Sequence, residues 1–131
     1  MLRDISVRTS KRNELVNITS QVEEIVSESK VKNGLCIVYC PHTTSGIIVN
    51  ENADPDVVSD LLEALEKIVP KINFRHVEGN SDAHLKSTLV GCEKTFVVKN
   101  GALGLGTWQG IFYAEFDGPR DRRVLVKIVS D

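Results

Sequence analysis

Residues 35–49 read LCIVYCPHTTSGIIV, and this stretch predicts two strands with a polar break between them. Its first six residues form a continuous apolar run, which is typical of a buried strand. The β-branched run at 47–49 predicts the next strand. Residues 41–46 between them are polar, so the sequence places candidate chemistry in a loop that joins two strands of the core.

Towards the N-terminus, the pattern predicts a β-hairpin. Ile5 and Val7 alternate with polar residues, and residues 15–18 form a second short β-like segment. The polar residues 9–13 between them are expected to form the turn. A helix should follow, because Ser20 and Glu23 match a capping box. The apolar face of that helix would consist of Val22, Ile25 and Val26, with Gly34 beyond its end.

Towards the C-terminus, two further helices are expected. Asp54 is a candidate N-cap with Pro55 at the first helical position, and Pro70 ends the segment. Its apolar stripe would be Val58, Leu61, Leu62, Leu65 and Ile68. The polar residues 75–82 come next. Asn80 or Ser81 is then expected to cap a short helix that bears Leu85, Leu89 and Val90 and stops at Gly91.

The remaining residues predict mainly strands, at 96–98, 111–116 and 124–129. Asn100-Gly101 is a strong hairpin signal after the first of them. Apolar strands with helices at unequal spacing indicate an α+β fold with two to three helices and a largely antiparallel sheet. At 131 residues the chain fits a single domain, 1–131.

Composition and charge exclude several classes of protein. Sixteen Lys and Arg against eighteen Asp and Glu give a net charge of −2, which argues against nucleic acid as a partner. No apolar run approaches the roughly 18 residues of a membrane span. Arg3 and Asp4 stand where a signal peptide needs apolar residues, so we expect a cytoplasmic protein. Cys36 and Cys40 lie in an apolar run and are expected in the core.

The three histidines, His42, His76 and His84, lie in polar segments or at element starts. Imidazole is a common metal ligand and proton carrier, so folding could gather them into an open metal site. Their spacing matches no zinc motif, and the alternative is three surface or hydrogen-bonded histidines. Nearby carboxylates could bind Mg²⁺, orient a histidine or act as a general base. These are Glu51, Asp54, Glu78, Asp82, Glu115 and Asp117, of which Asp54 fits a helix cap better.

The glycine-dense residues 101–110 match neither a dinucleotide fingerprint nor a P-loop. They favour either close approach to an anionic ligand or a bulged edge strand. Trp108, the only tryptophan, is expected as a core anchor or, alternatively, a stacking platform. Arg120 follows Gly118-Pro119 in a turn, where its guanidinium could bind phosphate or simply be solvated.

Four motifs in order carry a resemblance to a known family. They are PHTTSGIIVNENADPDV (41–57), HVEGNSDAHLKSTLVG (76–91), GLGTWQGIFYAEFDGPR (104–120) and RVLVKIV (123–129). Together they resemble the YjbQ-like family, whose members are called secondary thiamine-phosphate synthases. The resemblance spans roughly residue 18 to the C-terminus. The chain departs at Ser45 and at 47–49, where members often carry Ala and Leu-Thr-Ile.

The resemblance implies a curved β-sandwich, a homotrimer with polar sites near subunit boundaries, and thiamine-phosphate synthase activity. It implies a divalent metal, zinc or, with a pyrophosphate substrate, magnesium, on His42, His76 and His84. The expected catalytic residues are Glu51, Asp82 and Glu115. The expected substrate-binding residues are Thr43, Thr44, Asn80, Gly106, Thr107, Trp108, Gln109 and Arg120.

The expected function is therefore a metal-assisted transferase that acts on a phosphate ester or pyrophosphate. Arg120, backbone N–H groups and a metal would stabilise the leaving pyrophosphate. Two alternatives use the same residues. One is a non-catalytic trimeric protein that binds a small anionic metabolite, and the other is a metal-dependent hydrolase.

Overall fold

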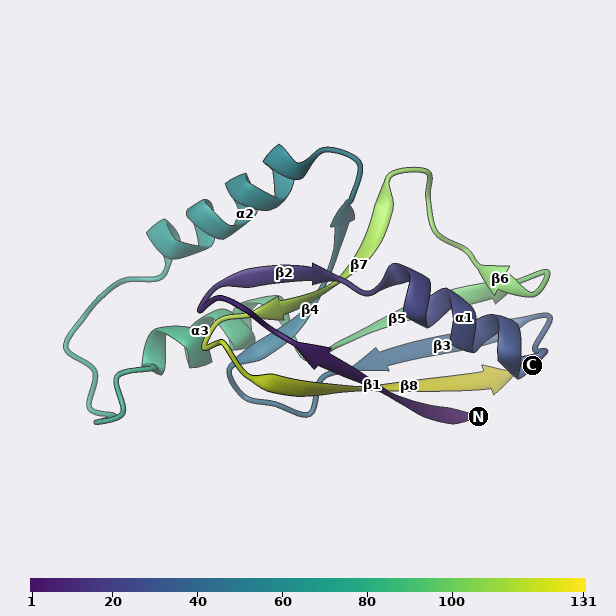
Figure 1. Ribbon diagram of the computed structural model, residues 1–131, viewed down its shortest axis with the longest axis horizontal. Coiled ribbons are helices and arrows are strands. Elements are labelled where there is room, and N and C mark those ends of the chain that lie inside the picture. The colour runs from purple at the N-terminus through teal and green to yellow at the C-terminus, as the bar shows by residue number, and fades with distance from the viewer.

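The computed structural model describes residues 1–131, which form two antiparallel sheets and three helices (Figure 1). The strands are β1 (Leu2–Arg8), β2 (Glu14–Asn17), β3 (Gly34–Tyr39), β4 (Ser45–Glu51), β5 (Glu93–Lys99), β6 (Ala102–Leu103), β7 (Gln109–Glu115) and β8 (Asp121–Ser130). The helices are α1 (Thr19–Ser29), α2 (Pro55–Ile68) and α3 (Ser81–Val90). This architecture confirms the predicted α+β class with an antiparallel sheet.

The strand order is β1-β8-β3-β5-β6 in the larger sheet and β2-β7-β4 in the smaller. The predicted hairpin between the first two strands is wrong, because β1 pairs with β8 and β2 pairs with β7. The Asn100-Gly101 hairpin is confirmed, and both residues have positive φ, at 53° and 81°. A two-residue turn of this kind needs positive φ at both central positions, which Asn and Gly tolerate.

The core lies between the larger sheet, α1 and strand β7. Strand β3 is not buried on both sides as expected. Cys36 and Val38 are fully buried, whereas Leu35 and Tyr39 are 43% and 40% exposed on the other face. Cys36 is a core residue as predicted, and burial raises the pKa of its thiol to about 11. Cys40 is also buried, and Cys92 is exposed.

Helix α1 begins differently from the prediction. The capping box at Ser20 is wrong, because α1 starts at Thr19 and no side chain caps it from Ile18. Instead the side-chain oxygen Oδ1 of Asn17 accepts from the backbone N–H and the hydroxyl of Thr19, at 3.0 and 2.6 Å. The helix ends at Lys30, in a left-handed conformation, rather than near Gly34.

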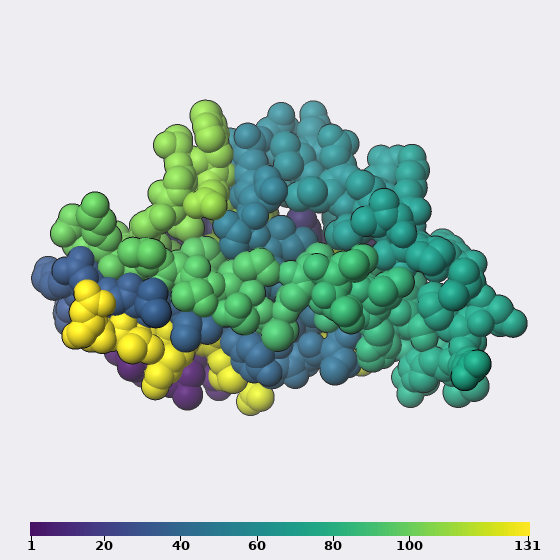
Figure 2. Space-filling model, turned by 180° about the vertical axis from the view of Figure 1, so that it is seen from behind, coloured from purple at the N-terminus to yellow at the C-terminus, as the bar shows by residue number.

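Helix α2 begins as predicted, since the Asp54 carboxylate accepts from the Asp56 N–H at 2.9 Å. It stands away from the sheets in Figure 1, and Figure 2 shows it and the following loop projecting from the body. None of its residues is fully buried, although it carries an apolar stripe. The α2 stripe is therefore only partly covered within one chain.

Helix α3 packs through a different face from the one expected. Its buried residues are Ala83, Lys86 and Ser87, whereas Leu89 is 56% exposed. The fold can bury the Lys86 ammonium because the ammonium donates to the Glu66 carboxylate of α2 and to the side-chain oxygen of Asn13. None of the three helices combines the length and the apolar character that are needed to cross a membrane.

Candidate functional site

A polar pocket opens where three loops meet, namely the β3–β4 loop, the segment before α3, and the β7–β8 turn. Its volume is about 460 Å³. Apart from Pro41, its lining consists of polar and charged residues. The lining residues are Pro41, His42, Thr43, Thr44, His76, Glu78, Asn80, His84, Asp117, Arg120 and Arg122. We call this cavity the polar pocket.

The polar pocket gathers one part of the expected site and leaves out another. The expected residues that line it are His42, Thr43, Thr44, Asn80, His76, His84 and Arg120. Those that do not line it are Glu51, Asp82, Gly106, Thr107, Trp108, Gln109 and Glu115. The expected residues therefore do not line one common pocket within one chain.

His42 is held by the backbone of β8. Its Nε2 accepts from the Arg123 N–H at 3.0 Å, so in neutral imidazole the other nitrogen, Nδ1, carries the proton. Burial lowers the pKa of His42 below 6.5, and the positive charges of Arg122 and Arg123 lower it further. His42 is therefore a neutral hydrogen-bond donor near neutral pH, with its one lone pair already in use.

His76 and His84 meet edge to face across the pocket. Their ring centroids are 5.7 Å apart and the rings are 82° from parallel. His76 Nε2 also lies 3.9 Å from the Glu78 carboxylate. Two imidazoles that share one zinc ion have centroids about 5 Å apart, because each Zn–N bond is about 2 Å long. An edge-to-face contact does not direct the in-plane lone pairs of both rings to one point, so the two rings would have to reorient to share a metal ion.

The third histidine fits a metal less well. No group of three or more His, Cys, Asp or Glu side chains in the chain is arranged to hold a metal ion. His42 would first have to give up its hydrogen bond from Arg123 to present a lone pair. The three-histidine metal site therefore stays a prediction, and His76 and His84 are the pair of its members whose rings are in contact.

Beneath the pocket lies a buried ion pair. Arg122 donates to both carboxylate oxygens of Glu115 and to the Thr44 hydroxyl. The side chains of Glu115 and Arg122 are 0% and 5% exposed. Burial alone would raise the pKa of Glu115, but hydrogen bonds from Arg122, Thr9 and the Asp117 N–H outweigh it and lower the pKa. Glu115, expected as a catalytic carboxylate, is fully buried in this chain and holds Arg122, and its catalytic role stays a prediction.

A second ion pair stands at the rim. Arg120 donates from its guanidinium to the Asp117 carboxylate and to the Asp117 backbone carbonyl, both at 2.8 Å. The Arg120 side chain is 53% exposed and Asp117 only 12%. The rim pair therefore presents a guanidinium to solvent within the same pocket as the histidines.

Asn80 is fixed by that rim pair. Its amide nitrogen donates to Asp117 at 2.9 Å, so its carbonyl oxygen has to face the other way. That buried oxygen has no hydrogen-bond partner in the chain. A buried acceptor without a donor costs roughly 1–3 kcal/mol, so this atom calls for a water molecule or a ligand.

The tryptophan loop lies at the opposite end of β7. Gln109 pairs with Glu51 across β7 and β4, and the Trp108 carbonyl accepts from the Asn52 N–H at 3.0 Å. Trp108 is 63% exposed, so its expected place in the core is wrong. A seven-residue strand is about 23 Å long, which keeps this loop far from the β7–β8 turn.

Asp82 lies in a neighbouring cavity rather than in the polar pocket. It accepts from Arg12 of the β1–β2 loop at 3.1 Å.

Sequence reasoning missed Arg122 as a pocket residue, although the sequence contained a signal for it. Arg122 is in phase with Val124, Val126 and Ile128, the buried face of β8. An arginine on the inward face of a strand implies a buried partner.

Comparison with known proteins agrees with the motifs. The family model described as UPF0047 protein YjbQ-like matches residues 3–131. The chain is 56% identical to UPF0047 protein MJ1081 of Methanocaldococcus jannaschii, over 100% of this chain and 96% of that protein. It is 47% identical to UPF0047 protein YugU of Bacillus subtilis, over 99% and 100%.

Solved structures show the same fold. A conserved YjbQ/UPF0047 protein from Clostridium acetobutylicum superposes with a TM-score of 0.94 at 52% identity, over 97% of this chain and 99% of that chain. A protein of unknown function from Sulfolobus solfataricus gives 0.96 at 39% identity, over 100% and 97%. With its four motifs, its fold and these relatives in agreement, the chain belongs to the YjbQ-like UPF0047 family.

Proposed function

We propose that the polar pocket binds a phosphorylated small molecule and that the chain catalyses group transfer on it. The observation that carries this is a pocket lined almost entirely by polar residues, in which a half-exposed guanidinium, Arg120, lies with three imidazoles. A guanidinium recognises phosphate through two parallel hydrogen bonds. The unpartnered carbonyl oxygen of Asn80 supports a ligand at the same place.

The residues divide the work. Arg120 binds the phosphate by exchanging Asp117 for it, while the buried Arg122, whose charge Glu115 balances, holds the Thr44 hydroxyl in place beneath the pocket. His84 and His76 carry protons when no metal ion is bound to them, and the Glu78 carboxylate lies 3.9 Å from His76. A zinc or magnesium ion on the histidines would supply charge stabilisation to a pyrophosphate leaving group.

The finer proposal comes from the family resemblance. It is thiamine-phosphate synthesis, in which a hydroxymethylpyrimidine pyrophosphate is joined to a thiazole phosphate and pyrophosphate leaves. Trp108, Thr107, Gln109 and Gly106 would then bind substrate from a neighbouring subunit, because within one chain they lie at the far end of β7. Glu51 belongs with them, since it pairs with Gln109.

A homotrimer is proposed on the same grounds, and the larger sheet supports it. On its outer face Leu35 pairs with both Val97 and Val129, and all three are exposed, at 43%, 59% and 42%. A contiguous apolar sheet face of this kind favours burial against another chain. Light scattering should give the mass of three chains for the wild type and of one for Val97→Lys.

The proposed activity is tested by turnover with the two phosphorylated substrates, with and without a chelator. Joined product that disappears on chelation and in His84→Ala supports the metal-assisted transferase. Binding without turnover would instead favour the metabolite-binding protein, and release of phosphate without joining would favour the hydrolase.

The exposed free thiol of Cys92 is typical of a reducing compartment, which supports the proposal of a cytoplasmic protein.

A further inference from the structure

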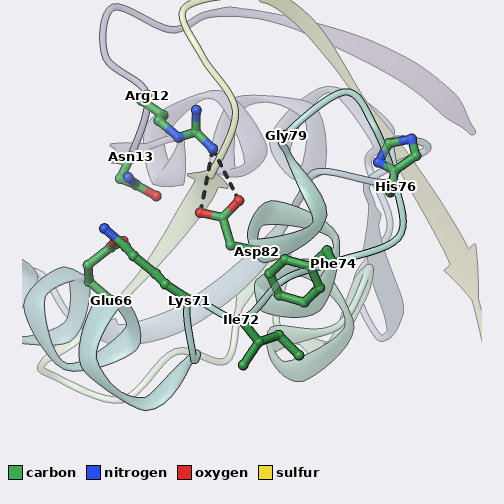
Figure 3. Close-up of a pocket in the computed structure, with 9 residues that line it drawn as sticks. All are labelled: Arg12, Asn13, Glu66, Lys71, Ile72, Phe74, His76, Gly79 and Asp82. Carbon is green, nitrogen blue, oxygen red and sulfur yellow. Dashed lines mark hydrogen bonds and ion pairs between the residues drawn. The ribbon is translucent and has the colours of Figure 1, made fainter.

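A second cavity of about 540 Å³ adjoins the polar pocket, and His76 lines both (Figure 3). We propose that this second cavity binds an uncharged aromatic ring of the substrate whose phosphate occupies the polar pocket. The substrate assignment rests on the proposed function, but the ring-binding cavity can be tested separately. The class of ligand follows from the lining, which differs from that of the polar pocket.

Part of the second cavity is apolar. Ile72 and Phe74 lie on one side of it, across from Arg12 and Asn13 (Figure 3). The Phe74 N–H donates to the Ile72 carbonyl at 3.0 Å, and this tight bend presents both side chains. Ile72 is 62% exposed, and neither residue belongs to the core. A half-buried phenyl ring in the wall of a cavity favours a planar ring packed against it.

The polar part of the lining is balanced in charge. Arg12 pairs with Asp82 at 3.1 Å, and Lys71 pairs with Glu66 at 3.2 Å. The arginines of the polar pocket are paired in the same way, so charge does not separate the two cavities, whereas the apolar side chains of Ile72 and Phe74 do. An uncharged ring with hydrogen-bonding groups at its edge suits a lining that combines apolar side chains with paired charges.

Two contacts hold the cavity in shape. The Asn13 carbonyl oxygen accepts from the buried Lys86 at 3.1 Å, which orients the amide and leaves its Nδ2 without a partner in the chain. The Arg12 backbone carbonyl accepts from the Gly118 N–H at 3.1 Å. This second contact links the wall of the cavity to the turn that carries Arg120. The proposed ring site and the proposed phosphate site are therefore held in a fixed position relative to each other.

The test is a pair of NMR titrations of the full chain with separate probes, 4-aminopyrimidine for the ring and methyl phosphate for the anion. The ring probe should shift the amide signals of Ile72 and Phe74, and methyl phosphate should shift those of Arg120 and Asn80. Phosphate binding without any response to the ring probe would overturn this inference and leave the proposed function standing. A response to the ring probe alone would support the cavity and remove the proposed function.

Matched variants of one loop sharpen the test. Phe74→Ala should weaken 4-aminopyrimidine binding about tenfold and leave methyl phosphate binding unchanged. Phe74→Leu, which keeps apolar volume but loses the ring, should lie between. Val77→Ala is the control, because Val77 is 95% exposed and lines neither cavity. Equal ring affinity in Phe74→Ala, Phe74→Leu and Val77→Ala would contradict the proposal.

Discussion

Two acid–arginine pairs flank the same β7–β8 turn and differ most in how deeply they are buried. Glu115 and Arg122 are almost completely buried, and Thr9 and Thr44 complete their hydrogen bonds. Asp117 and Arg120 stand at the rim, with the arginine half exposed. A buried pair cannot exchange partners, because either charge alone would be stranded without water. A pair at the rim can exchange partners, because water and a ligand reach it. An acid–arginine pair therefore stabilises the fold in one place and is available to bind a ligand in the other.

The largest expected effect comes from breaking the buried pair. Glu115→Gln keeps the shape of the side chain but removes the charge that balances Arg122. We expect the free energy of unfolding to fall by about 3–5 kcal/mol, measured by urea denaturation. A loss below about 1 kcal/mol would show that water reaches Arg122 and that the two pairs are alike.

Breaking the rim pair should affect binding rather than folding. Arg120→Ala should weaken the affinity for inorganic pyrophosphate by about ten- to a hundredfold, since a charge-assisted hydrogen bond contributes roughly 1.5–3 kcal/mol. Arg120→Lys keeps the charge without the planar fork and should lose less. Titration calorimetry measures both, with urea denaturation as the control for an unchanged fold. Equal affinity in wild type and Arg120→Ala would leave Arg120 a solvated turn residue.

Low pH should also destabilise the folded protein through the buried pair of Glu115 and Arg122, but by less than the Glu115→Gln substitution does. The pKa of Glu115 is lowered from 4.5 in the folded chain, so folding is favoured wherever the carboxylate is ionised. This stability is complete above the unfolded pKa and is lost as pH falls from about 4.5 through the lower folded value. Unfolding free energies at about pH 7 and about pH 3 should therefore differ less in Glu115→Gln than in wild type. Parallel pH profiles would refute this.

The smallest effect is expected at a third pair, Arg8 with Asp121, whose side chains are 84% and 78% exposed. Asp121→Asn should produce no measurable change in unfolding or in pyrophosphate binding, because solvent and salt screen such a pair. This variant serves as the matched control for the other two pairs. A clear loss of stability would mean that exposure does not separate the three pairs.

Local signals predicted local structure well. The Asp54 cap and the Asn100-Gly101 turn depend on residues within one or two positions of each other, and both are present. The first hairpin failed because β1 and β2 find their partners more than 90 residues along the chain, at β8 and β7. Nothing in residues 5–18 encodes those partners. The start of α1 was missed because Asn17 makes the stabilising contact from outside the expected motif.

The candidate site was predicted in part for a related reason. Motifs place chemistry-bearing residues close in sequence, and the turns that carry His42, His84 and Arg120 do converge. Trp108 and Arg120 belong to one motif, yet an extended strand lies between them and carries them to opposite ends. Burial was the other unknown, because Glu115 is equally polar in sequence whether it faces solvent or lies beneath the pocket.

The strand order has a consequence for how the protein folds during synthesis. β8 lies between β1 and β3, and β7 lies between β2 and β4. Each sheet thus receives an interior strand from residues 109–130, while its other members come mostly from earlier in the chain. During synthesis, the strands made first have exposed edges until those residues emerge. Such non-local pairing slows folding and leaves the edges of the earlier strands open to aggregation until residues 109–130 have been made.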